Sequence, residues 1–252
     1  MTLWRLELLR LTRTRRWVAL VGVFVFFGLL GPLSARYLAE IVSFAGGELE
    51  GATIEFPPPV PADGMAQYVS NALQIGTLVA VVVAAGALAF DAVPEMGVFL
   101  RTRIDSVTRI LIPRVAMTTA AVVASFVLGA LTAWYMTWAL IGSPDAGAVL
   151  VGLLFGVVFL VFVVALVAAV AGRASTVLGT VMVSIVVLLI MPVVSIADSI
   201  GRWLPTHLAG ALGALPAGAA EAGDYAGVTV VTLIVTAGLF WLGVHFAARR
   251  EL

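Results

Sequence analysis

The sequence has no cysteine and no lysine, and charged residues of any kind are scarce. Without cysteine, the chain cannot form disulfides, thiolate metal sites or a cysteine nucleophile. Without lysine, it lacks the residue that a phosphate-binding P-loop needs after its glycines, so it cannot hydrolyse ATP by that route. Only 11% of the 252 residues are charged and 62% are apolar, whereas about a quarter of a soluble domain is charged. This composition indicates an integral membrane protein.

Common catalytic patterns are missing as well. Neither H-E-x-x-H nor G-x-S-x-G occurs in the sequence, so there is no signature of a zinc protease or of a serine hydrolase. The two histidines, His207 and His245, are predicted on opposite sides of the membrane and cannot share a metal ion. We therefore expect no catalytic, metal-binding or cofactor-binding residues in this chain.

Six apolar segments are each long enough to cross a bilayer as a helix, for which about 20 residues are needed. None alternates apolar and polar residues as a membrane β-strand does. The sequence therefore predicts an all-α, polytopic integral membrane protein in which residues 1–252 form a single transmembrane domain. We place the six transmembrane helices near residues 17–35, 73–92, 115–141, 146–171, 175–197 and 227–248.

Two connections and the first segment need separate comment. Residues 36–72 are expected to form a long external loop, with a stiff proline-rich stretch at 56–61. Residues 201–226 are too short to cross and return as two full helices and too apolar for a free loop, so we expect a short interfacial or re-entrant helix. The first apolar segment is long enough to span and is followed by a poor cleavage site at 33–35, so a retained first helix is expected.

The fourteen arginines are distributed unevenly between the connections. Apart from Arg36 and Arg202, they precede the first span, follow the last, or lie between the second and third or the fourth and fifth. Basic residues are retained on the cytoplasmic side of a bilayer, so both termini are predicted to be cytoplasmic. Nine acidic residues lie in the predicted external connections, so the arginines report topology and no nucleic-acid partner is indicated. The lack of lysine beside abundant Ala, Val and Gly is typical of a GC-rich coding bias, and we expect a prokaryotic plasma membrane.

Residues 1–16 combine apolar residues and arginines at helical spacing. Two interpretations of this segment remain open. It can form an amphipathic helix that lies on the cytoplasmic leaflet and binds membrane lipids, or it can be a basic anchor that only sets the topology. The first interpretation rests on Trp4, Leu8 and Leu11 on one helical face, with Arg5 and Arg16 opposite.

The connection at residues 91–114 has the most specific sequence, DAVPEMGVFLRTRIDSVTRILIPR. It resembles the ABC-2-type permeases, the membrane subunits of one large class of ATP-driven exporters. The basic N-terminal segment, the six spans and the apolar stretch at 203–208 are similar to that family too. The residues that carry the resemblance in this connection are Glu95, Gly97, Leu100, Thr102, Arg103, Arg109, Ile110, Leu111 and Arg114.

The resemblance implies a transport subunit without an ATPase site of its own. Family members are dimers of six-span units, identical or paralogous, and each unit rests on a separate ATP-binding subunit that holds the ATP and Mg. Asp91 has two open interpretations, a coupling or salt-bridge site and a hydrated helix end. By the resemblance, coupling to the ATPase subunit would involve Glu95, Gly97, Leu100, Arg101, Thr102, Arg103 and Arg109.

The resemblance further implies that the first, second and fifth spans line a route between two protomers. Small residues in the second and fifth spans suit either a narrow path or plain helix packing, and both interpretations stay open. They are Gly76, Ala80, Ala84, Gly179, Thr180 and Ser184.

The spans offer few polar groups, so we expect a hydrophobic or amphipathic cargo such as a drug, a lipid-like molecule or a secondary metabolite. Two other functions remain open. One is an intramembrane enzyme acting on lipids or peptides, for which Asp91 and Glu95 would be the close acidic pair. The other is a membrane scaffold that transports nothing.

Overall fold

The structure is a computed structural model that describes residues 3–45, 57–89, 107–174 and 176–249. Every regular element in these ranges is a helix. Six helical stretches are long and apolar enough to cross a membrane, which confirms the prediction of an all-helical chain with six candidate spans. They are Arg16–Arg36, Pro61–Leu88, Leu111–Leu140, Ala146–Arg173, Val177–Val194 and Ala222–Ala247.

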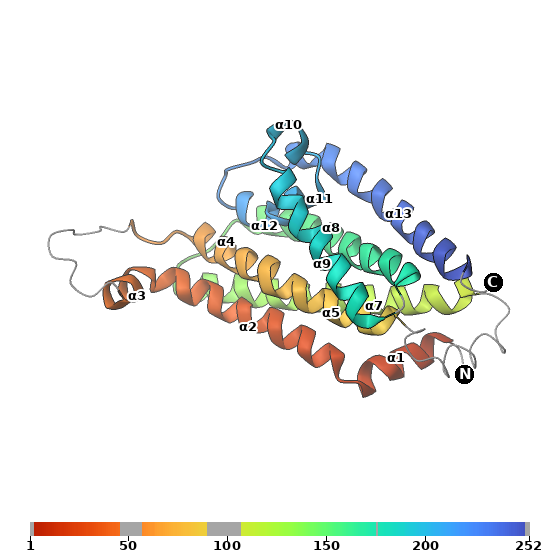
Figure 1. Ribbon diagram of the computed structural model, residues 1–252. Helices are drawn as coiled ribbons and strands as arrows, with labels where there is room; N and C mark the ends of the chain where they lie inside the picture. The colour runs from red at the N-terminus through yellow and green to blue at the C-terminus, as the bar shows by residue number, and fades with distance from the viewer. Residues whose placement is uncertain (1–2, 46–56, 90–106, 175, 250–252) are drawn as a thin grey trace.

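The long helices lie side by side in one bundle, and shorter helices cap it (Figure 1). In chain order the helices are α1 Leu3–Arg13, α2 Arg16–Arg36, α3 Leu38–Ala45, α4 Pro61–Asn71, a π-helical turn Ala72–Gly76, α5 Thr77–Leu88, α7 Val107–Leu140, α8 Ala146–Arg173, α9 Val177–Val194, α10 Asp198–Gly201, α11 Pro205–Ala209, α12 Ala211–Ala214, a 3-10 turn Ala222–Tyr225, and α13 Ala226–Arg249.

The described helix ends that carry most of the arginines lie at one end of the bundle (Figure 1). Figure 1 shows α1, the start of α7 and the end of α13 at this end, with α3 and the start of α4 at the other. Arg36, one of the two arginines outside the main pattern, ends α2 next to α3. Because α1 and the end of α13 lie at the same end (Figure 1), the chain passes along the bundle an even number of times, as six membrane spans require. That the arginine-rich end faces the cytoplasm remains a prediction.

The second candidate span begins earlier than predicted, so the expectation of a loop over residues 36–72 was wrong. Helix α4 starts at Pro61 and continues through the π-helical turn into α5, and α3 occupies another part of the expected loop. Pro61 suits the first turn of a helix because its missing N–H needs no partner there. The Val60 N–H donates to Asp63 Oδ2 at 2.8 Å, which fixes this start. Because α4 contains several polar residues, a prediction based on continuous apolar segments does not detect this helix.

The third and fifth candidate spans also differ from the predicted ranges. Helix α7 begins at Val107, several residues before the predicted start, and it contains Arg109, Pro113 and Arg114. The fifth helix, α9, is shorter than predicted and ends at Val194, soon after Pro192. Proline lacks the N–H that an α-helix interior requires, so a helix commonly weakens or ends near it.

Residues 201–226 fold into short helices, as their apolar character suggested. Helices α11 and α12 pack against α8, and α12 also packs against α4. Leu208, Ala211 and Leu212 are fully buried. At Gly152 of α8 an added Cβ would lie 2.5 Å from the Leu212 Cα, so the glycine permits the close approach of α12. The segment is therefore part of the folded core.

Helices α2 and α7 form the tightest long-range contact around Gly129. An added Cβ at Gly129 would lie 2.5 Å from the Phe24 carbonyl oxygen and 2.8 Å from the Tyr68 hydroxyl. Tyr68 is fully buried, and its hydroxyl donates to the Phe126 carbonyl oxygen at 3.1 Å. The rings of Phe24 and Phe126 meet edge to face with centroids 5.8 Å apart. Gly129 thus lets α2, α4 and α7 meet at one point.

Substitution of Gly129 by alanine is expected to destabilise the fold by about 1–3 kcal/mol, because the methyl group overlaps backbone that cannot move aside cheaply. The matched control is Gly238→Ala in α13, where no described atom lies within 4 Å of an added Cβ. That substitution is expected to be neutral or to stabilise by up to about 1 kcal/mol. Thermal unfolding in a neutral detergent measures both. Equal midpoints for the two variants would contradict the packing argument.

Candidate functional site

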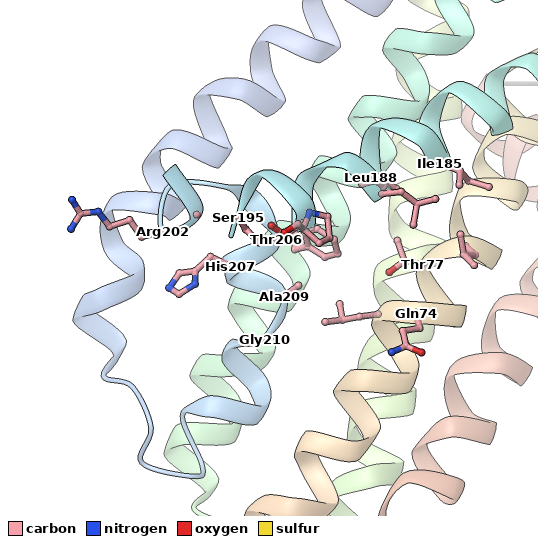
Figure 2. Close-up of a pocket in the computed structure, with 16 residues that line it drawn as sticks. Gln74, Thr77, Ile185, Leu188, Ser195, Arg202, Thr206, His207, Ala209 and Gly210 are labelled. Carbon is pink, nitrogen blue, oxygen red and sulfur yellow. Dashed lines mark hydrogen bonds between the residues drawn. The ribbon is translucent and has the colours of Figure 1, made fainter. Parts of the chain in front are cut away.

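A cavity of about 800 Å³ lies between the second candidate span, α9 and the short helices α10 and α11 (Figure 2). Pockets for small molecules usually span about 300–1,000 Å³ and are mostly apolar with a few polar groups. This cavity fits that description. Leu73, Leu78, Phe159, Ile185, Leu188 and Leu189 supply apolar walls.

The wall from the second candidate span is formed at the π-helical turn. This turn, Ala72–Gly76, adds Leu73 and Gln74 to the cavity lining, and Thr77 follows directly after it. The Thr77 hydroxyl donates weakly to the Ala72 carbonyl oxygen at 3.5 Å. Single π turns inside α-helices are frequent at functional sites because they redirect side chains. The turn therefore places a neutral amide beside otherwise apolar walls.

The facing wall comes from the last turns of α9. Ile185 and Leu188 lie across the cavity from Thr77 and Gln74 in Figure 2. Pro192 also lines the cavity, and because it has no N–H the Leu188 carbonyl lacks its usual helical donor.

The rim of the cavity is more polar than its walls. His207 of α11 is exposed, and its ring stacks on Tyr225 with centroids 4.9 Å apart. Arg202 is the charged residue among the described lining residues, and Figure 2 shows its side chain directed away from the cavity. Neutral polar groups and an apolar wall suit a hydrophobic or amphipathic molecule better than an ion or a sugar.

The six small residues predicted for a pathway or a protomer interface lie in packed positions beside this cavity. An added Cβ at Gly76 would lie 2.7 Å from the Phe24 ring, so Gly76 packs against α2. The Gly179 N–H donates to Thr176 Oγ1 at 3.0 Å in the first turn of α9. The other four are fully buried: Ala80, Ala84, Thr180 and Ser184.

None of these six residues lines the cavity, but the residues that follow two of them do. Thr77 follows Gly76, and Ile185 follows Ser184. The Ser184 hydroxyl is buried and has no hydrogen-bond partner among the described residues. The sequence signal for the cavity was the polar pair Gln74 and Thr77 within an otherwise apolar span.

The N-terminal segment forms a separate helix, α1, that docks on α7 through an ion pair. Glu7 Oε1 accepts a hydrogen bond from Arg114 Nε at 3.0 Å and lies 2.9 Å from Arg114 Nη2. The Arg114 side chain is only 3% exposed. Sequence reasoning missed Glu7, although it is the one acidic residue in a strongly basic segment. Helix α1 ends at Arg13 and Arg16 begins α2, so the predicted single helix over residues 1–16 was wrong in its extent, and both interpretations of this segment stay open.

The residues assigned to the interfacial helix keep an outward face free of this contact. Trp4 and Leu8 are about half exposed, and Arg5 is exposed as well. Leu11 and Arg16 are partly buried and line a cleft between α1, α2 and α7. Helix α1 therefore presents apolar residues outward and binds the bundle through its one carboxylate.

Of the residues expected to couple to an ATPase subunit, Arg109 is described, and it is exposed in the first turns of α7. The remaining ones, together with Asp91, lie outside the described residues. They are Glu95, Gly97, Leu100, Arg101, Thr102 and Arg103.

In the described part of the chain, no three His, Asp or Glu residues are grouped closely enough to hold a metal ion. The chain has no match among protein-family models, curated proteins or solved structures. The relation to the ABC-2-type permeases therefore stays a resemblance.

Proposed function

We propose that this chain is the membrane-spanning subunit of an ATP-binding cassette exporter. It would move hydrophobic or amphipathic molecules, and a separate subunit would bind and hydrolyse ATP with Mg. The observation that carries the proposal is the apolar cavity of about 800 Å³ between the second and fifth candidate spans. Its size and its neutral polar groups match a drug-sized or lipid-like cargo.

The opposite end of the bundle supports a role in coupling. Helix α1 and the start of α7 lie at the same end, away from α3 and the start of α4 (Figure 1), and the first turn of α7 carries the exposed Arg109. Arginines on such a surface can pair with acids of a partner and set the orientation of docking. The ion pair between Glu7 and Arg114 links α1 to α7. A movement of α1 caused by the ATPase subunit would therefore be transmitted directly to α7, which is one of the candidate spans.

A second permease subunit, identical or paralogous, would complete the transporter. Helix α9 is the least buried of the six candidate spans. Its outward residues are large and apolar, as a lipid-facing or protomer-facing surface requires. They include Leu178, Met182, Val186, Ile190 and Val193.

Co-expression with a cognate Walker-motif ATPase subunit is expected to yield a stable complex in detergent. The purified chain alone is expected to hydrolyse no ATP, because it lacks the P-loop lysine. In proteoliposomes the complex is expected to move hydrophobic dyes only when ATP is present, and a partner with its Walker lysine replaced serves as the control. ATP hydrolysis by the chain alone would overturn the proposal. A complex without any flux would favour a scaffold.

The enzyme alternative has a separate test. Replacing Asp91 with Asn and Glu95 with Gln removes the acidic pair that an intramembrane hydrolase would use. Under our proposal, neither the parent nor this variant forms product from a lipid or peptide, whatever the Glu95 substitution does to coupling with the ATPase subunit. Loss of product formation on a lipid or peptide substrate, measured without ATP, would favour the enzyme instead.

A further inference from the structure

A cleft with an excess of positive charge lies where α1, α2 and α7 meet. Arg10, Arg16 and Arg114 line it together with Glu7. The three arginines come from three different helices of the fold. Guanidinium groups gathered in one partly buried place repel each other unless anions balance them.

The one carboxylate among the described lining residues is committed to Arg114. Glu7 Oε1 is the atom that meets Arg114, at 2.9 and 3.0 Å. Glu7 Oε2 lies 3.8 Å from Arg10 Nη1, which is too far for a hydrogen bond. That Nη1 atom is buried and has no hydrogen-bond partner among the described residues. Since buried donors are normally satisfied, an acceptor is expected there.

Arg16 supplies the second donor group of the cleft. It is partly buried, and the described part of the chain places no carboxylate within salt-bridge distance of it. An added Cβ at Gly86 would lie 3.5 Å from the Arg16 guanidinium, so this side chain rests against α5. Arg10 and Arg16 thus place two guanidinium groups in one cleft, where the described carboxylate, Glu7, is 3.8 Å from Arg10 and hydrogen-bonded to Arg114.

The surroundings of this pair indicate the kind of anion. Leu11, Ala87 and Met117 add apolar surface to the cleft. Trp4 and Leu8 on α1 expose apolar side chains nearby along the same helix. Amphipathic helices of this composition lie at the level of lipid headgroups, where phosphate groups are abundant. Basic pockets between membrane helices bind lipid headgroups.

We infer that this cleft binds the phosphate group of an anionic phospholipid, with Arg10 and Arg16 as its ligands. Guanidinium groups bind phosphate oxygens through paired, charge-assisted hydrogen bonds. The lipid would fix α1 to the bundle beside the Glu7–Arg114 ion pair. This inference does not depend on transport.

The test uses the purified full chain in a neutral detergent at about 0.15 M salt, where exposed charges are largely screened beyond ~8 Å. Dioleoylphosphatidylglycerol or dioleoylphosphatidylcholine is titrated in, and the thermal unfolding midpoint is followed. Phosphatidylglycerol is expected to raise the midpoint in a saturable manner, and phosphatidylcholine much less. In R10Q/R16Q the apparent affinity for phosphatidylglycerol is expected to fall about tenfold or more.

Two further variants make the result specific. R13Q/R15Q removes the same charge from exposed positions outside the cleft, and its affinity is expected to stay within about threefold of the parent. R10K/R16K keeps the charge and loses the planar fork, so intermediate affinity is expected. The lysine variant keeps the test valid where the glutamine variant folds poorly.

A separate titration with inorganic phosphate distinguishes the two sources of a phosphate group. Stabilisation by phosphatidylglycerol without any effect of inorganic phosphate supports the lipid. Stabilisation by inorganic phosphate that is lost in R10Q/R16Q would keep the phosphate site but replace the lipid by a soluble ligand. Equal weakening in R10Q/R16Q and R13Q/R15Q, or equal midpoints with both lipids, would overturn the inference.

Discussion

Replacement of Glu7 by alanine is expected to lower the free energy of unfolding by about 3–5 kcal/mol, because it removes the carboxylate that balances a buried guanidinium. Glu7 contacts Arg114 at 2.9 Å, and the Arg114 side chain is 3% exposed. A cation in such a place loses most of its hydration, so the cost of losing the carboxylate is large. Thermal or denaturant-induced unfolding of the detergent-purified chain measures the effect.

The matched control is Arg5→Ala, which removes an exposed charge from the same helix and is expected to change stability by less than about 0.5 kcal/mol. The double variant E7L/R114L removes both charges of the pair. It is expected to be much closer to the parent than E7A, since an apolar pair can replace a buried ion pair at little cost. If E7A unfolds with the parent midpoint, the ion pair does not hold α1 on α7.

The membrane helices that sequence predicted best are those in which apolar residues are continuous. Helix α8 runs from Ala146 to Arg173, close to the predicted 146–171, because no charged residue interrupts it before Arg173. Asp145 also marks its start, since its carboxylate accepts from the Gly147 N–H at 2.7 Å. Length, hydropathy and one capping residue are all local properties, so sequence alone carries them.

The second candidate span shows where a reading of hydropathy fails. Helix α4 contains Asp63, Gln67 and Asn71, so no long apolar run exists there. Its helical state rests on local start signals at Pro61 and on burial of Tyr68 against α7. The first of these could have been found in the sequence, but the second depends on a partner 58 residues away.

The candidate sites depend on tertiary geometry that leaves no local trace. Glu7 and Arg114 are 107 positions apart in the sequence. An arginine at the start of a membrane span can simply mark the cytoplasmic side or can form an ion pair, and the sequence does not distinguish the two roles. The π-helical turn at Ala72–Gly76 shifts the helical register by one residue, because its hydrogen bonds run from i+5 to i. A periodicity of 3.6 residues does not predict this shift. The small residues of the second and fifth candidate spans indicated helix faces that pack closely, but the cavity is lined by other residues of the same spans.

Replacement of Gln74 by tryptophan is expected to weaken stimulation of the ATPase complex by hydrophobic compounds. Gln74 is an exposed side chain that lines the cavity, so an indole there can narrow the cavity without disturbing buried packing. The narrowed cavity hinders cargo binding, and the apparent affinity for stimulating compounds is expected to fall about tenfold or more, equivalent to ~1.4 kcal/mol of binding free energy. ATPase activity in proteoliposomes across a panel of hydrophobic and amphipathic compounds is the measurement.

Ile75→Trp is the matched control, because Ile75 is 46% exposed on the same helical turn and does not line the cavity. Its stimulation is expected to stay near the parent value. Leu188→Trp narrows the cavity from the facing wall on α9 and is expected to reproduce the effect of Gln74→Trp. Co-elution with the ATPase subunit confirms that each variant still assembles. Because the two substitutions come from opposite walls and share only the cavity, weaker stimulation in both but not in Ile75→Trp would locate the cargo there. Full stimulation in both would remove the cavity from the transport path.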